Sequence, residues 1–258
     1  MSTEVHGAAI VHDGAELGKD VTIGPYSVIG PDVKIGEGTS VASNVLIDGH
    51  TTIGAGNTIF HGAVLGTPPQ DLKYRGARSS VRIGDNNMIR EYATVNTATN
   101  EGDATIVGSG CLMMAYSHVA HDCIIGDNVI LANAVNLAGH VTIYDHAILG
   151  GMVPVHQFVR IGVHSFVGGG SRVAKDVLPY VKVAGSPPKV SGLNTVGLKR
   201  RGFEDSQLDR IKAAYRLIYR SGLNVTQAIE RIEIEIESSE EIEILLDFIR
   251  GSQRGITL

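Results

Sequence analysis

The chain places an apolar residue at every sixth position over most of its length. An unbroken run of twelve such residues fills its middle: Val107, Met113, Val119, Ile125, Leu131, Leu137, Ile143, Leu149, Val155, Ile161, Val167 and Val173. A second run extends from Val5 to Leu65, and a short third run extends from Ile83 to Val95. A six-residue period is typical of a parallel β-helix, in which each unit contributes one short strand and one corner.

The same period predicts which side chains point inward. The position two before each apolar residue is small or β-branched, as at Ser27, Thr39 and Val129. Two inward positions per strand predict a thin, dry core. Three six-residue units close one turn, so residues 18 apart are expected on neighbouring rungs, roughly 4.8 Å apart. Spacing in the sequence therefore serves as a distance ruler along the repeat.

Two segments interrupt the period inside the repeat domain, which we assign to residues 1–190. Residues 66–80 are rich in turn formers and basic residues, and residues 97–104 are polar and include Glu101 and Asp103. Loops that leave a solenoid lie on its surface and often carry binding groups. A tolerated insertion would have the same appearance, and the sequence leaves both interpretations open.

After Val173 the pattern changes from six-residue units to helical spacing. Residues 176–194 contain three prolines and are expected to form an exit segment. Apolar residues three or four apart between 208 and 218 predict a helix that stops near Gly222. Residues 226–238 fit a helix or a strand, and their helical surroundings favour a helix; residues 240–250 predict another. We therefore predict a C-terminal α-helical domain at 191–258 that caps the open end of the β-helix.

Composition narrows the class of protein. The 258 residues are 43% hydrophobic with a net charge of -5, which argues against a general nucleic-acid binder and against a disordered chain. No apolar stretch approaches the roughly 20 residues of a membrane span, and no signal peptide opens the chain. We expect a cytoplasmic protein without a transmembrane segment.

One basic cluster stands out against this acidic background. Seven basic residues lie between 199 and 220: Lys199, Arg200, Arg201, Arg210, Lys212, Arg216 and Arg220. Such a cluster would steer an anionic partner, although a solvated helix face with counter-charges is the simpler interpretation. The two cysteines, Cys111 and Cys123, fall in the inward position two before a core residue and are expected to be buried thiols.

Histidines give the clearest indication of chemistry. On the 18-residue ruler His121 aligns with Gly139 and then Gln157, so His140 and His156 lie one position from this column. We expect the three histidines to cluster across three rungs. A cluster of imidazoles beside a glycine is more suggestive of a functional site than a lone histidine is.

A further histidine pair, His146 and His164, is spaced by 18 residues and should stack on another corner, where we expect a structural role.

The motif SHVAHD at 117–122 places Asp122 directly after His121. A neighbouring carboxylate orients an imidazole and favours proton uptake from a hydroxyl, which is the task of a general base. No serine elbow and no persuasive cysteine nucleophile accompanies it, so direct transfer is favoured over a covalent enzyme intermediate. If a thioester were attacked, the backbone N–H of Gly139 would be placed to stabilise the oxyanion.

A column of small residues predicts a groove. Asn133, Gly151 and Gly169 are 18 apart, and each is preceded by another small residue. An extended alkyl chain could lie along such a face. Glycines at tight corners are the structural alternative.

Five motifs together make a resemblance specific. QDLKY at 70–74, HVAHDC at 118–123, LAGHV at 137–141, VHQF at 155–158 and GLKRRGF at 197–203 closely resemble the UDP-N-acetylglucosamine acyltransferases of lipid A biosynthesis. The resemblance covers essentially the whole chain. It implies a left-handed parallel β-helix and a homotrimer with sites between subunits, consistent with the general preference for closed cyclic symmetry.

The resemblance also implies an activity. Such enzymes transfer a 3-hydroxyacyl chain from acyl carrier protein to the 3-position of UDP-N-acetylglucosamine, the first step of lipid A biosynthesis. The acyl donor is carried on the phosphopantetheine of the carrier protein, so no bound cofactor and no metal is expected.

The resemblance carries roles over to individual residues. It makes His121 the general base, Asp122 its orienting partner and Gly139 the oxyanion donor. Gly169 resembles the position that limits acyl length, and a glycine there implies a longer chain. His118, His140, His156 and Gln157 would line the acyl and sugar site.

Contacts to the nucleotide and to the partner proteins follow from the same resemblance. Asp71 and Lys73 match positions that reach the sugar nucleotide and acyl chain from the neighbouring subunit. Asn194 and Arg201 resemble nucleotide contacts, and Arg200 belongs to the basic patch expected to meet acyl carrier protein.

The sequence departs from the resemblance at two places near the acceptor. Asn96 stands where a histidine is common near the sugar, and Val196 stands where an acidic nucleotide contact is expected. Some related enzymes acylate the 3-amino sugar analogue and form an amide. The two departures leave the acceptor open between the hydroxyl and the amine.

Other hexapeptide proteins remain as alternatives. A different hexapeptide acyltransferase would share the repeats, and a γ-class carbonic anhydrase would use three imidazoles to bind zinc. A non-catalytic scaffold or ice-binding β-helix would need a regular polar ladder, such as a threonine ladder, which the sequence lacks. The order of the five motifs favours the acyltransferase.

Overall fold

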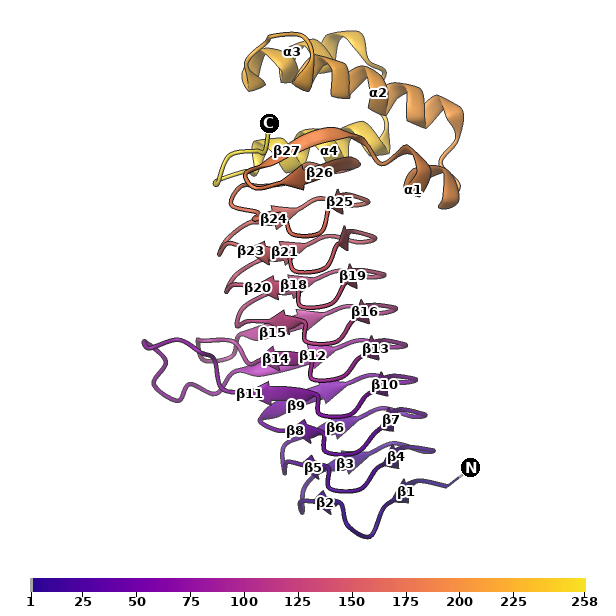
Figure 1. Cartoon of the computed structure of the whole chain (residues 1–258), viewed down its shortest axis with the longest axis vertical. Coiled ribbons are helices and arrows are strands. Elements are labelled where there is room, and N and C mark those ends of the chain that lie inside the picture. Colours follow the sequence, from indigo (N-terminus) through magenta and orange to yellow (C-terminus); the bar gives the residue numbers. More distant parts are fainter. Residues whose placement is uncertain (1) are drawn as a thin grey trace.

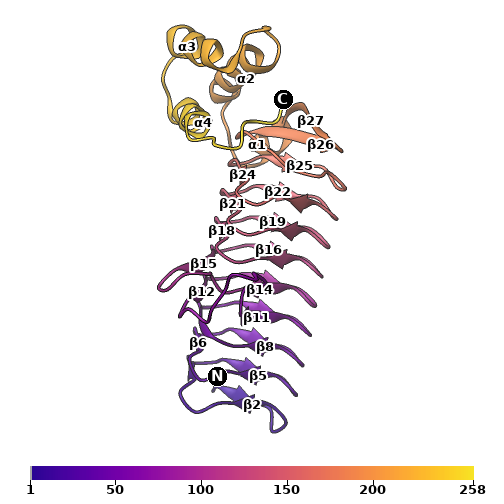
Figure 2. The same ribbon diagram turned by 90° about the vertical axis from the view of Figure 1, so that its left-hand side faces the viewer.

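The computed structural model describes residues 2–258, which form a triangular stack of short parallel strands with helices at one end (Figures 1 and 2). Successive strands go to successive faces, so every third strand pairs in register with its neighbour above and below. This is the left-handed parallel β-helix with a C-terminal α-helical region that the resemblance implied.

Three parallel sheets form the faces of the prism. The first face holds β1 (Glu4–Val5), β4 (Thr22–Ile23), β7 (Ser40–Val41), β10 (Thr58–Ile59), β13 (Met88–Ile89), β16 (Leu112–Met113), β19 (Ile130–Leu131), β22 (Ile148–Leu149), β25 (Phe166–Val167), β26 (Val181–Gly185) and β27 (Pro188–Leu193). The second holds β2 (Ile10–Val11), β5 (Val28–Ile29), β8 (Leu46–Ile47), β11 (Val64–Thr67), β14 (Thr94–Asn96), β17 (His118–Val119), β20 (Asn136–Leu137) and β23 (Pro154–Val155). The third holds β3 (Glu16–Leu17), β6 (Lys34–Ile35), β9 (His50–Ile53), β12 (Ser80–Ile83), β15 (Ala104–Val107), β18 (Ile124–Ile125), β21 (Thr142–Ile143) and β24 (Arg160–Ile161).

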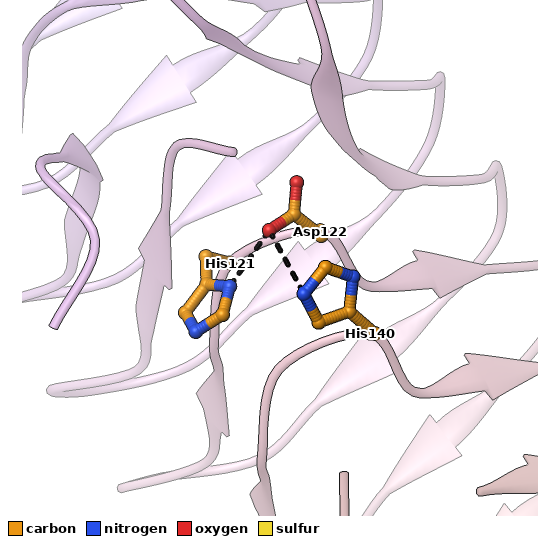
Figure 3. Close-up of side chains that lie close together, drawn as sticks. All are labelled: His121, Asp122 and His140. Atoms are coloured by element: carbon orange, nitrogen blue, oxygen red, sulfur yellow. Dashed lines mark hydrogen bonds and ion pairs between the residues drawn. The ribbon is translucent and has the colours of Figure 1, made fainter. Parts of the chain in front are cut away.

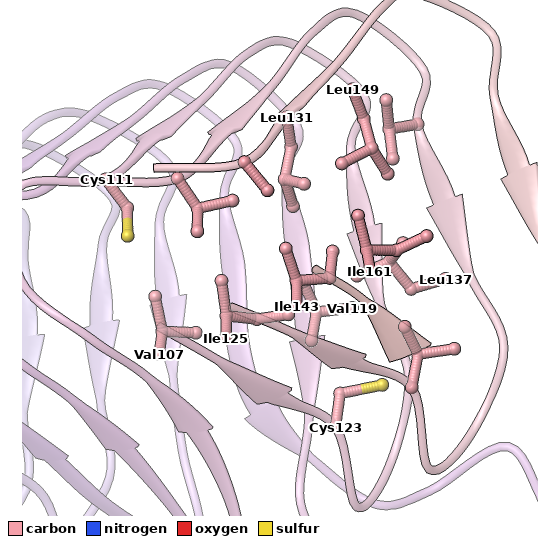
Figure 4. Packing of buried hydrophobic residues seen from close by; sticks show 14 of the residues in the cluster. Val107, Cys111, Val119, Cys123, Ile125, Leu131, Leu137, Ile143, Leu149 and Ile161 are labelled. Atoms are coloured by element: carbon pink, nitrogen blue, oxygen red, sulfur yellow. The ribbon is translucent and has the colours of Figure 1, made fainter. Parts of the chain in front are cut away.

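The core is the predicted apolar column. All twelve residues of the long run, from Val107 to Val173, are at most 3% exposed, and the small inward positions such as Ser27 and Thr39 are fully buried (Figure 4). At the open N-terminal end the same register is not covered, because no rung lies below it. There Val5 is 46% exposed.

The cysteines are part of this core, as predicted. Cys111 and Cys123 are free, buried thiols whose side chains project among the apolar residues (Figure 4). Burial raises the pKa of Cys111 to about 11 and that of Cys123 to about 12. Neither thiol is therefore a thiolate nucleophile at neutral pH.

The 18-residue ruler holds wherever the repeat is uninterrupted, as in the pairing of His118 with Asn136. It fails across the loops. Thr58 pairs with Met88 across the first loop, and Thr94 pairs with His118 across the second. The inserted residues leave the stack and return to it without changing which side chains face inward.

The C-terminal region contains the predicted helices and one short helix more. The helices are α1 (Thr195–Arg200), α2 (Asp205–Tyr219), α3 (Val225–Glu235) and α4 (Glu240–Arg250). The ambiguous segment 226–238 is mostly helical, and α3 begins with a capping box between Asn224 and Gln227. Because β26 and β27 pair antiparallel, the expected exit segment is a hairpin that extends the first sheet. The predicted domain boundary at 190 falls inside β27.

The C-terminal tail is attached to the last rungs by Asp176. This fully buried carboxylate accepts hydrogen bonds from the backbone of Arg160 at 2.8 Å and from the hydroxyl of Ser252 at 2.7 Å. The backbone of Asp176 also pairs with Gly255 and Thr257. Within residues 2–258, every helix is too short or too polar to cross a bilayer.

Candidate active site

The site is built around His121 and Asp122, at the corner that follows β17 (Figure 3). Nδ1 of His121 lies 2.7 Å from Oδ2 of Asp122, and the two side chains are only 15% and 9% exposed. An ionised carboxylate can only accept hydrogen bonds, so Nδ1 carries the proton. Nε2 of His121 is then left with a lone pair and can accept a proton from a bound group.

Asp122 is kept ionised by its hydrogen bonds. Burial alone would raise its pKa, but hydrogen bonds from His121 and from Thr99 outweigh burial and hold the pKa below its ordinary value. The Thr99 hydroxyl donates to Oδ2 at 2.8 Å and its backbone N–H donates to Oδ1 at 3.2 Å. Thr99 lies in the second loop, where the 18-residue spacing fails, so its contact with Asp122 was not predictable from the repeat.

His140 lies on the other side of the same carboxylate. Its Nε2 is 3.5 Å from Oδ2 of Asp122, and its ring meets that of His121 edge to face at 5.3 Å between centroids (Figure 3). The predicted contact between these two histidines is confirmed. The side chain stacked on His140 from the next rung is Phe158, at 4.7 Å.

His156 faces a different partner. Its Nδ1 is 3.0 Å from Nη2 of Arg254, in the C-terminal tail, and its side chain is exposed together with that of Gln157. The expectation that His156 would join His121 and His140 in one cluster was therefore wrong at the level of direct contacts. The tail, whose position the repeat does not determine, pairs with the third histidine.

Two imidazoles and one carboxylate form the metal-capable group of this site. One ligand atom from each of His121, Asp122 and His140 lies within 4.8 Å of the others. This donor set is chemically able to hold a divalent cation. In the structure the same atoms are already linked by the His121–Asp122 hydrogen bond.

Gly139 lies against the imidazole of His121, as the ruler predicted. A Cβ atom at this position would lie 2.3 Å from Cε1 and 2.6 Å from Nε2 of His121, so a side chain would displace the ring. The N–H of Gly139 makes no hydrogen bond to any of residues 2–258. It is therefore available to a negatively charged oxygen beside His121.

His118 borders the site from β17. Its Nδ1 is 2.7 Å from the hydroxyl of Thr94 on the rung below. Burial, reinforced by the proximity of His121, lowers the pKa of His118, so this imidazole is neutral at pH 7. A neutral ring beside the His121–Asp122 pair, hereafter the dyad, adds no positive charge that would compete with His121 for Asp122.

The remaining predicted contacts lie away from the dyad. Asp71 and Lys73 belong to the first loop, which projects sideways from the prism (Figure 1), and the Asp71 carboxylate accepts the N–H of Lys73 at 2.8 Å. Gly169 is exposed, and a Cβ there would lie 3.1 Å from the carbonyl of Gly151. At Gly151 and Gly169, the column of small residues therefore presents backbone without side chains.

Asn194 and the basic residues lie where the β-helix meets the helices. Asn194 caps α1 by accepting the N–H of Gly197 at 3.3 Å, and it donates to the carbonyl of His164 at 3.0 Å. Arg200 and Arg201 are exposed and, among residues 2–258, form no salt bridge with a carboxylate. Their charges are thus free for an anionic ligand or partner.

The two departures differ in their surroundings. Asn96 is buried and donates to the carbonyls of Thr67 and Pro68, while its Oδ1 has no hydrogen-bond partner within the described chain. Asn96 thus anchors the base of the first loop. Val196 is 60% exposed at the start of α1.

The second histidine pair forms the predicted stack. The rings of His146 and His164 lie 4.7 Å apart and nearly parallel, and Phe203 packs against His164 edge to face. Burial lowers the pKa of His164 to about 4, with smaller contributions from His146 and Arg201. This pair is a neutral packing element.

A separate concave space lies beside α4. A cleft of about 350 Å³ lies between the upper corner of the β-helix and α4, lined by Tyr144, Arg160 and Phe248 among others. Arg160 lies over the Phe248 ring at 4.4 Å and donates to the Tyr144 hydroxyl at 2.7 Å, so this cleft is where α4 attaches. The His121–Asp122 pair is not part of this cleft's lining.

Comparison with known proteins gives consistent matches. Residues 176–257 match the family model described as UDP-N-acetylglucosamine O-acyltransferase, domain 2, and residues 14–49 and 104–139 match the model of bacterial transferase hexapeptides. A protein from Syntrophobacter fumaroxidans named acyl-[acyl-carrier-protein]–UDP-N-acetylglucosamine O-acyltransferase is 51% identical, covering 98% of this chain and 99% of the relative. One of the same name from Trichlorobacter lovleyi is 53% identical and covers 98% of each.

A solved structure agrees over the same length. The UDP-N-acetylglucosamine acyltransferase of Francisella novicida superposes with a TM-score of 0.95 at 43% identity. The match covers 98% of this chain and 93% of that one.

Proposed function

The chain belongs to the UDP-N-acetylglucosamine O-acyltransferase family and is an acyltransferase, and on this premise we propose that it transfers a 3-hydroxyacyl chain from acyl carrier protein to the 3-position of UDP-N-acetylglucosamine. This is the first step of lipid A biosynthesis. The donor arrives on the phosphopantetheine arm of the carrier protein, so the reaction needs no resident cofactor.

The observation that carries the mechanism is the His121–Asp122 pair beside Gly139. Nε2 of His121 takes the proton from the 3-hydroxyl while that oxygen attacks the thioester carbonyl. The N–H of Gly139 donates to the oxyanion that develops on the carbonyl oxygen. When the tetrahedral intermediate collapses, the C–S bond breaks and His121 returns the proton to the leaving phosphopantetheine thiolate.

Asp122 supplies orientation and charge rather than a proton. Its carboxylate fixes Nδ1 as the protonated nitrogen and stabilises the imidazolium that forms during the attack. His118 and His140 border this centre, and we assign them, with His156 and Gln157, to the lining of the sugar and acyl site.

The first loop, which projects sideways from the prism (Figure 1), supports a site completed by a second subunit. We propose a homotrimer in which Asp71 and Lys73 on the projecting first loop reach the ligand of the neighbouring subunit (Figure 1). Asn194 and Arg201 would contact the nucleotide, and Arg200 would meet the acidic carrier protein. The bare backbone at Gly169 would admit a long acyl chain.

A 3-amino sugar is the second candidate acceptor, because Asn96 stands where the family commonly has a histidine near the sugar. Direct attack by an amine would use the same base and the same oxyanion donor and would form an amide.

Mass spectrometry of the product distinguishes these outcomes. The purified protein receives a mixture of 3-hydroxyacyl carrier proteins together with UDP-N-acetylglucosamine and its 3-amino analogue. An ester on the ordinary sugar is the expected product, and an amide would make the amine the acceptor. Absence of any acylated sugar would overturn the proposal. It would favour the alternative of a zinc-binding γ-class carbonic anhydrase, which metal analysis of the same sample would test.

A further inference from the structure

The second loop, residues 97–103, returns to the β-helix directly beneath Asp122. It leaves the stack after β14 and re-enters at β15, where the hydroxyl of Thr105 accepts the backbone N–H of Asp122 at 2.9 Å. The loop is braced on its outer side, because Arg78 donates its N–H to Glu101 and Ser79 donates its hydroxyl to the carbonyl of Ala98. The loop is thus a supported structure under the dyad.

Thr99 is the part of this loop that reaches the carboxylate. Its hydroxyl donates to Oδ2 of Asp122 at 2.8 Å, and its backbone N–H donates to Oδ1 at 3.2 Å. Within residues 2–258, Thr99 alone bonds to both carboxylate oxygens. Two bonds to two oxygens fix the rotation of the carboxylate about its Cβ–Cγ bond.

That rotation matters because Asp122 has two imidazoles within reach. Oδ2 bonds to Nδ1 of His121 at 2.7 Å and lies 3.5 Å from Nε2 of His140 (Figure 3). A rotation of the carboxylate would move Oδ2 relative to both imidazoles. The group that holds the carboxylate therefore decides which histidine it orients.

We propose that Thr99 is a positioning residue that clamps Asp122 toward His121 and away from His140, and that the second loop serves to supply this clamp. The inference rests on the proposed function, because it assigns His121 the role of base. In this proposal Thr99 acts only through its two bonds to Asp122.

The test compares serine and alanine at position 99. Thr99→Ser keeps the hydroxyl and Thr99→Ala removes it, and both lose the methyl group, so the two variants differ by one oxygen atom. Loss of a residue that orients a metal-binding side chain typically costs about 10- to 100-fold in activity, and we expect a similar scale for a residue that orients Asp122. We expect kcat of Thr99→Ala to fall about tenfold or more below that of Thr99→Ser, with KM for UDP-N-acetylglucosamine within about twofold.

A third variant and a control separate positioning from packing. Thr99→Val keeps the shape without the hydroxyl and should behave like Thr99→Ala. Thr58→Val, a comparably half-buried threonine on β10, should leave kcat unchanged. Equal kcat for the serine and alanine variants, or a change confined to KM, would overturn the clamp.

The same assay keeps the two proposals apart. His121→Ala is measured beside the Thr99 series. If His121→Ala turns over like the wild type, the proposed base is wrong and the clamp falls with it. If His121→Ala is inactive while Thr99→Ala matches Thr99→Ser, the proposed function stands and only the clamp is wrong.

Discussion

Two histidine pairs occupy different corners of the same β-helix. Their surroundings indicate a catalytic role for one pair and a packing role for the other. His121 and His140 meet edge to face on either side of the Asp122 carboxylate. His146 and His164 stack in parallel, and Nδ1 of His146 is buried without a hydrogen-bond partner in the described chain. The repeat brings histidines together at both corners, but within residues 2–258 only the first pair lies within 4 Å of a carboxylate oxygen.

The Asp122 carboxylate is the structural difference between the two corners. Asp122 stabilises a positive charge on a neighbouring imidazole, as a general base requires. At the second corner, burial lowers the pKa of both His146 and His164, and the positive charge of Arg201 acts in the same direction. Asp145 and Asp127 oppose this at His146, but their effect is smaller and its pKa remains lowered. That corner disfavours protonation, and its rings fill space beneath Phe203.

Exchange of a histidine for alanine at each corner gives the largest contrast. We expect His121→Ala to lower kcat by about 10³-fold, because loss of a general base costs about 10² to 10⁴. His146→Ala should leave kcat within about threefold of the wild type, since its ring stacks on His164 at a different corner from the His121–Asp122 pair. Steady-state assays of both variants check this, and a similar loss at both corners would remove the distinction.

We expect the next largest effect from a substitution of Gly139. It tests the position of the His121 ring without removing a titratable group. Gly139→Ala leaves every titratable group in place but puts a methyl group into the His121 ring. Displacement of a catalytic group by about 1 Å can cost about a hundredfold, and we expect a loss of kcat of that order. Gly7→Ala, where a Cβ meets nothing within 4 Å, is the matched control. Wild-type turnover by Gly139→Ala would show that this contact is unimportant.

The smallest effect concerns the pH dependence of stability at the second corner. His164 has a folded-state pKa of about 4, against about 6.5 in an unfolded chain, so the unfolded state takes up its proton first as the pH falls. Stability from this residue is present above pH 6.5 and is lost as the pH falls toward 4. After allowance for partial exposure, we expect His164 to lower the free energy of unfolding by about 1 kcal/mol between pH 7 and pH 5.

His164→Phe tests that expectation, because it keeps a stacking ring and removes the titration. Its melting temperature should fall less between pH 7 and pH 5 than that of the wild type. His12→Phe, at an exposed position, should keep the wild-type pH dependence. If the melting temperature of His164→Phe fell with pH as steeply as that of the wild type, the assigned role of His164 would be wrong.

The sequence predicted those parts of the molecule that the 18-residue period controls. The buried column, the contact of His121 with Gly139 and the stack of His146 on His164 all lie in the uninterrupted run. Each follows from parallel strands in register, which place equivalent positions directly above one another.

Features that depend on inserted or terminal segments were not predictable in this way. Thr99 reaches Asp122 from a loop that breaks the ruler, and Arg254 reaches His156 from a tail whose path depends on the helices. The β26–β27 hairpin was not predicted, because the prolines of this segment indicated an irregular exit segment instead. Tertiary packing decides these contacts, and no local period encodes it.

The most direct test of the account is chemical rescue of the first corner. The rate of acyl transfer from 3-hydroxyacyl carrier protein to UDP-N-acetylglucosamine is measured for His121→Ala at increasing concentrations of imidazole. If His121 acts as the base, transfer is slow without imidazole and rises as free imidazole takes the place of the missing ring. Transfer by His121→Ala at close to the wild-type rate without imidazole would contradict the account.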